Sequence, residues 1–127
     1  MAKNNKPDMD LPSSEEVKKF EMLYPLINSD LSEIRELSKK KQDEPSNKFK
    51  VKTINKKLEI VKGILKNEPT YDFLELLDED TFPSNSDAVL MISQFIKAME
   101  QFRKRFYTND GAEFSFSGEK KSWKTKD

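Results

Sequence analysis

Seven carboxylates between residues 68 and 87, with no basic side chain among them, are the densest set of groups that could do chemistry. Five of them form one acidic face: Asp72, Glu75, Asp78, Glu79 and Asp80. On a continuous helix Asp72, Glu75 and Glu79 would share a side, where carboxylate oxygens could bind Mg²⁺ or Ca²⁺. A calcium loop beginning at Asp78 would need glycine at its sixth position, where Pro83 stands. We therefore predict no metal site and interpret this face as solvated or as a docking surface for a basic partner.

Lysines dominate the preceding part of the chain, where residues 39–66 hold ten Lys and three acids. Five of these lysines lie together on a predicted helix: Lys48, Lys50, Lys52, Lys56 and Lys57. A stripe of lysines can follow a phosphate backbone, but without Arg it offers few of the bidentate contacts that distinguish bases. The block favours a solvated face, pairing with the acidic block of the same molecule, or weakly specific binding of nucleic acid.

The C-terminal segment interleaves aromatic and basic side chains. Phe114, Phe116 and Trp123 stand among Ser, Gly and Lys residues. Such aromatics can dock in a partner's groove or stack on unpaired bases. Two alternatives stay open, namely that the tail folds back onto its own domain and that it is disordered.

The composition excludes several kinds of catalysis. The 127 residues include no His and no Cys, and 23 basic side chains balance 23 acidic ones. Ser-His-Asp and Cys-His catalysis, zinc fingers, haem ligation by these residues and disulfides are therefore excluded. Carboxylate, Lys, Tyr or Ser chemistry remains for an enzyme. We predict no catalytic residue and no cofactor, and keep a carboxylate–metal hydrolase as the enzymatic alternative.

No apolar run is long enough to span a membrane, and the polar first twelve residues lack a signal-peptide core. We expect a cytoplasmic protein without membrane contact. The Lys- and Asn-rich composition is typical of a bacterial or phage protein.

The first predicted helix runs from about residue 14 to residue 42. Its apolar positions recur at spacings of three and four residues: Val17, Phe20, Tyr24, Ile27, Leu31 and Ile34. Ser13 and Glu16 have the spacing of a capping box. Because the ring of Pro25 clashes with the carbonyl four residues earlier, we expect a kink or break near Tyr24.

Three more helices follow a polar linker at residues 42–47. Apolar spacing predicts one helix over about 47–67, and in it Gly63 favours close packing against another helix. A short helix of about two turns is predicted over 71–78. The last helix starts at candidate caps between Ser84 and Asp87 and ends near residue 107.

These elements predict an all-α fold, a compact antiparallel bundle of three long helices and one short helix with flexible polar termini. We divide the chain into a polar N-terminal arm (1–12), a helical bundle domain (13–107) and an aromatic and basic tail (108–127). Extra apolar positions at Ile60, Ile64, Leu90 and Ile96 leave a homodimer open.

The pattern as a whole favours a small non-enzymatic protein–protein interaction module, such as an accessory subunit, adaptor, inhibitor or antitoxin-like protein. We expect it to act through its charged faces and its tail, with another protein as the partner. The alternative is a weakly sequence-specific nucleic-acid-associated protein that uses the Lys-rich helix.

Overall fold

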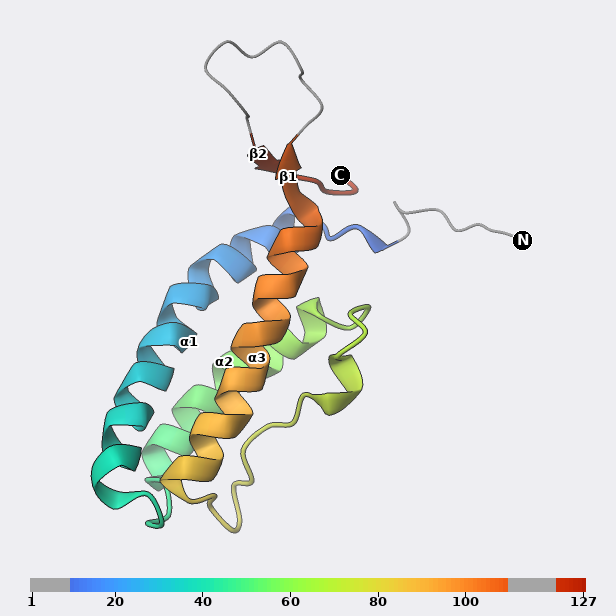
Figure 1. The fold of residues 1–127 in the computed structure, drawn as a ribbon. Helices are drawn as coiled ribbons and strands as arrows, with labels where there is room; N and C mark the ends of the chain where they lie inside the picture. The colour runs from blue at the N-terminus through green and yellow to red at the C-terminus, as the bar shows by residue number, and fades with distance from the viewer. Residues whose placement is uncertain (1–9, 110–120) are drawn as a thin grey trace.

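The computed structural model describes residues 10–109 and 121–127, which form a bundle of three helices with a small hairpin at one end (Figure 1). The elements are, in chain order, α1 (Ser14–Lys41), α2 (Lys48–Ile64), the 3₁₀ turn η2 (Tyr71–Phe73), α3 (Asn85–Phe106), β1 (Tyr107–Asn109) and β2 (Lys121–Trp123). The predicted all-α fold is confirmed. α1 runs antiparallel to α2 and to α3, and these two run in the same direction because residues 65–84 return along the bundle (Figure 1).

Helix α1 begins at the predicted capping box. The Ser13 hydroxyl accepts a hydrogen bond from the Glu16 backbone N–H at 3.1 Å, and the Glu16 carboxylate accepts from the Ser13 N–H at 2.9 Å. Of the predicted kink or break near Tyr24, the break is wrong, because α1 continues through Pro25 as one helix, and its ribbon curves along its length in Figure 1. Pro25 lies on the exposed side of the helix, so water can satisfy the carbonyl that loses its partner. The apolar stripe on the opposite side stays buried and holds the two halves together.

The predicted short helix over 71–78 is also wrong, because only the single turn η2 forms and the chain is extended after it. The buried amide of Asn55 on α2 explains the extended form. Its Nδ2 donates to the Leu77 carbonyl at 2.8 Å, and its Oδ1 accepts from the Leu77 N–H at 2.9 Å. These two bonds replace those of a helix and let Leu74 and Leu77 enter the core.

Gly63 does not pack against another helix, contrary to the sequence interpretation. It is exposed, and a Cβ added there would meet nothing within 4 Å. This glycine is simply tolerated on the outer side of α2.

Helix α3 packs mainly along α1 and completes the core of the bundle. The Ser84 hydroxyl caps it by accepting from the Asp87 N–H at 3.1 Å, as the sequence predicts. Its buried side chains pack against those of α1 and α2: Ala88, Ile92, Phe95, Ile96, Ala98, Met99, Phe102 and Phe106. After Phe106 the chain enters β1, which pairs antiparallel with β2 so that Tyr107 lies opposite Trp123.

A polar network closes the other end of the bundle. The buried Asn85 at the start of α3 donates from Nδ2 to the Lys41 carbonyl at 2.9 Å, and its Oδ1 accepts from the Ser46 hydroxyl at 3.3 Å. The loop between α1 and α2 is thereby fixed to the N-terminus of α3. None of the described helices is long and apolar enough to cross a membrane.

Candidate functional site

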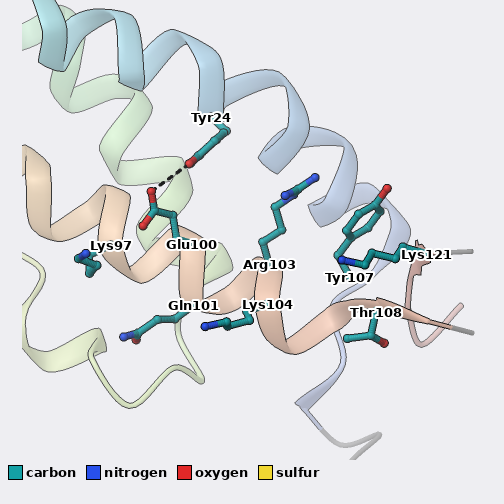
Figure 2. Close-up of a pocket in the computed structure, with 9 residues that line it drawn as sticks. All are labelled: Tyr24, Lys97, Glu100, Gln101, Arg103, Lys104, Tyr107, Thr108 and Lys121. Carbon is teal, nitrogen blue, oxygen red and sulfur yellow. Dashed lines mark hydrogen bonds between the residues drawn. The ribbon is translucent and has the colours of Figure 1, made fainter. Parts of the chain in front are cut away.

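A hollow in the described surface lies between α1, the C-terminal half of α3 and the hairpin, and we name it the α1–α3 cleft. It encloses about 770 Å³. Figure 2 shows the residues that line it: Tyr24, Lys97, Glu100, Gln101, Arg103, Lys104, Tyr107, Thr108 and Lys121. The helical repeat places Lys97, Gln101 and Lys104 along one side of α3. β2 brings in Lys121 from far along the sequence.

Positive charge is in excess in the α1–α3 cleft. Its lining includes the four cations of Lys97, Arg103, Lys104 and Lys121 and one carboxylate, that of Glu100, which accepts a hydrogen bond from the Tyr24 hydroxyl at 3.3 Å. The four cations make no ion pair with any residue of the described ranges. The Arg103 guanidinium lies 4.6 Å from the centre of the Tyr107 ring, a cation–π contact that leaves the edge of the guanidinium available for hydrogen bonds.

Trp123 fixes the hairpin beside the cleft. Its ring lies 5.2 Å from Phe20 and 5.4 Å from Tyr107, measured between ring centroids. Its indole N–H donates to the Glu21 carboxylate at 2.5 Å. For this residue the contacts favour the tail packing onto its own domain. The other two tail aromatics, Phe114 and Phe116, lie outside the described residues.

The tail and the N-terminal arm also meet at this end of the bundle. The Lys126 N–H donates to the Pro12 carbonyl at 2.9 Å, and the Ser14 N–H donates to the Asp127 carboxylate at 2.7 Å. These contacts and the pairing of β2 with β1 hold the strand that carries Lys121 beside the cleft.

The acidic face is spread along the extended chain rather than gathered on a helix. Asp72, Glu75 and Asp80 are exposed. The three carboxylates considered for a metal, Asp72, Glu75 and Glu79, do not share a helix side because residues 74–80 are not helical. Asp78 Oδ1 accepts from the backbone N–H groups of Thr81 and Asp80, which lowers the pKa of this carboxyl. The described residues contain no group of three or more ligands that could hold a metal ion.

Glu79 also has a structural partner. Its carboxylate accepts a hydrogen bond from Asn55 Nδ2 at 2.9 Å, next to the bonds that Asn55 makes to Leu77. Two of the five acidic residues therefore help to shape the returning segment, and the other three are free to meet a partner.

The lysines of α2 fall into two groups. Lys50 Nζ lies 2.6 Å from the Glu33 carboxylate and Lys57 Nζ lies 2.7 Å from that of Asp30, so both pair with α1. The other three candidates are exposed: Lys48, Lys52 and Lys56. Elsewhere in the basic block, Lys39 pairs with Glu36 of α1, Lys41 pairs with Glu44 of the following loop, and Lys62 lies over the ring of Tyr71.

Of the extra apolar positions, Ile64 and Ile96 are buried in the core of their own subunit. They are not available to a second copy, which corrects that part of the homodimer interpretation. Ile60 and Leu90 are exposed.

A buried carboxylate that sequence reasoning missed ties α3 to the segment after α2, and its arginine partner also reaches the N-terminal arm. The side chain of Glu68 is 2% exposed and lies 2.6 Å from Arg105 Nη1, while Arg105 Nη2 reaches Asp10 at 3.3 Å. Burial raises the pKa of Glu68 above its usual value, although the neighbouring Arg105 opposes this. In the sequence Glu68 stands before a proline in a turn, a context that gives no sign of burial.

The cleft itself was also missed, because its residues come from three separated segments. The cluster Arg103 to Arg105 was visible in the sequence, but its place near a helix C-terminus, where cations favour the helix dipole, explained it without a ligand.

Comparison of the chain with family models, curated proteins and solved structures finds no match. The chemistry of the described surfaces is therefore the basis for any functional assignment.

Proposed function

We propose that this protein is a small non-enzymatic protein–protein interaction module of the cytoplasm, and that the α1–α3 cleft binds an acidic segment of a partner protein. The supporting observation is the set of four cations without a carboxylate partner among the described residues, gathered around one hollow. Carboxylates of an incoming segment would supply the missing charge, and Arg103 can hold one in bidentate fashion.

The shape and the aromatic side chains of the cleft fit a peptide segment. About 770 Å³ is room for several side chains, and the rings of Tyr24 and Tyr107 offer apolar surface with a polar tip. Hydrogen bonds from Gln101 would add contacts to a backbone. Trp123, on the edge of this site, would report occupancy through its fluorescence, since it is the single Trp of the chain.

The second candidate is weakly specific binding of nucleic acid through α2. The observation that favours it is the exposure of Lys48, Lys52 and Lys56 on one helix. The pairing of Lys50 and Lys57 with α1 weakens it, because two of the five lysines then have their charge compensated within the subunit. Binding of a basic partner to the acidic face stays a prediction.

Fluorescence anisotropy with two labelled probes separates these functions. The probes are an oligoglutamate peptide and an oligothymidine strand, each titrated with three proteins: the wild type, Arg103→Glu/Lys104→Glu and Lys48→Glu/Lys52→Glu. The two double variants carry the same change in charge, and all four residues are exposed. Circular dichroism checks that both variants fold.

We expect oligoglutamate to bind the wild type, to lose at least about tenfold in affinity with the cleft variant and to change little with the α2 variant. Raised salt should weaken the binding. Equal losses in both variants, or no binding of oligoglutamate, would contradict the cleft proposal. Tighter binding of oligothymidine that is lost with the α2 variant would establish the nucleic-acid function instead.

A further inference from the structure

Exposed apolar side chains gather on the side of the bundle formed by α1 and α2. Six large hydrophobic residues are exposed in the described chain, and four of them belong to these two helices: Met22, Leu26, Phe49 and Ile60. Phe49 is 76% exposed. Large side chains of this kind lose favourable burial when they stay in water, so their concentration on one side indicates an interaction surface.

Two ion pairs fix how α1 and α2 lie against each other. Lys57 pairs with Asp30 and Lys50 with Glu33, which sets the level of α2 relative to the antiparallel α1. One helical turn beyond the first pair, Ile60 on α2 comes level with Leu26 on α1. Met22 lies a further turn along α1. These three side chains therefore form one apolar patch at one end of the surface.

Phe49 stands at the other end, beside a hollow of about 220 Å³. The hollow is lined by apolar and polar groups of both helices: Asp30, Glu33, Ile34, Phe49, Lys50, Thr53 and Ile54. A projecting ring and a hollow large enough for one side chain thus lie next to each other on the same surface. That combination is self-complementary, because a two-fold axis between them lets each copy fill the hollow of the other.

We propose that this α1–α2 surface is the interface of a homodimer, with a second copy of the chain as its occupant. A two-fold axis parallel to the helices places α1 of each copy over α2 of the other. Residues at the same height along the axis in the two copies then lie opposite each other. Phe49 then enters the other copy's hollow, and Ile60 meets the other copy's Leu26 and Met22. The contact closes on itself and needs no third copy.

Charge also fits a second copy better than a strongly charged foreign partner. Lys50 and Lys57 pair with Glu33 and Asp30 within the subunit, so the middle of this surface has its charges compensated and two copies can meet there without repulsion. A purely basic or purely acidic partner would find no uncompensated charge to match at these pairs.

The proposed dimer leaves the α1–α3 cleft open, because that cleft lies on the other side of α1. If the homodimer proposal fails, the proposed function of the cleft is unaffected. If both hold, the dimer presents two cleft sites, and a partner with two acidic segments gains in avidity.

Sedimentation equilibrium over a wide dilution series of the full chain tests the interface. We expect a reversible dimer for the wild type and a shift of at least about tenfold toward monomer for Phe49→Ser. Phe73→Ser is the matched control, because Phe73 is 72% exposed but lies on η2, away from this surface. It should dimerise like the wild type. A monomeric wild type, or equal effects of the two variants, overturns the proposal.

Cross-linking gives a second measurement that does not depend on a destabilising variant. The chain has no cysteine, so a single Thr53→Cys places one thiol at the hollow, close to the proposed axis. A short bismaleimide should join two such chains, and it should join few chains of the Thr81→Cys control, whose thiol lies in the exposed loop before α3. Equal yields for the two positions would contradict the interface.

Discussion

The basic side chains of α2 and of α3 differ in whether they form ion pairs within the fold. On α2, Lys50 and Lys57 reach across to carboxylates of α1 at 2.6 and 2.7 Å. On α3, Lys97, Arg103 and Lys104 line an open cleft and find no carboxylate among the described residues. α2, which has more lysines, thus has part of its positive charge compensated by α1. α3, which has fewer, carries the uncompensated positive charge that lines the cleft.

Polar side chains on the inner side of α2 hold the fold together, and the largest expected effect tests this. Asn55→Ala removes the partners of both the buried N–H and the buried C=O of Leu77. Each group left unpaired costs about 1–3 kcal/mol, so we expect the free energy of unfolding to fall by about 3 kcal/mol. Urea denaturation followed by circular dichroism measures the change.

The exposed Asn67 just after α2 supplies the control. Asn67→Ala should change the free energy of unfolding by less than about 0.5 kcal/mol. If Asn55→Ala is equally mild, the extended segment is held by Leu74 and Leu77 alone and the polar clamp adds nothing.

Sequence periodicity predicted the elements whose burial repeats along a helix. α1, α2 and α3 appear within a few residues of their expected bounds, and the caps at Ser13 and Ser84 form as the side-chain pattern indicates. The wrong predictions concern segments whose conformation is determined by a contact with a residue far away in the sequence. The segment after Tyr71 has helical spacing, but Asn55 takes its backbone bonds, and a sequence gives no sign of which amide will do so.

The site was harder to predict than the fold, for a related reason. The α1–α3 cleft combines Tyr24, Arg103 and Lys121, which come together only when the hairpin packs through Trp123. Charge counted along the chain pointed instead to the lysines of α2. Such counts cannot show which cations face a carboxylate across a helix contact.

The contrast between the two helices sharpens when one lysine of each is removed. Lys57→Ala leaves Asp30, a carboxylate only 20% exposed, without its cation, so we expect a loss of about 1–2 kcal/mol in unfolding free energy. Lys97→Ala in the cleft should cost less than about 0.5 kcal/mol. Parallel thermal and urea unfolding measure both, and equal losses would mean that the ion pair with α1 contributes no more than an exposed lysine.

The smallest effect concerns Arg105, the terminal cation of α3 that does have a buried partner. Burial raises the pKa of Glu68, so above the ordinary value of 4.5 the folded chain keeps a proton on this carboxyl that the unfolded chain has lost. The folded state then binds more protons than the unfolded state. The contribution of Glu68 to the stability of the fold therefore falls as the pH rises from that value through the raised pKa.

Glu68→Gln removes this titration while keeping the side chain's size. The wild type minus Glu68→Gln difference in unfolding free energy, measured by urea denaturation at closely spaced pH values, should therefore decline as the pH rises through that window. An increase would mean that Arg105 outweighs burial and lowers the pKa. Arg105→Gln should make the decline steeper, because it removes the cation that stabilises the charged carboxylate. Arg103→Gln, two residues earlier in the open cleft, should leave the decline unchanged, since that cation has no buried carboxylate to stabilise.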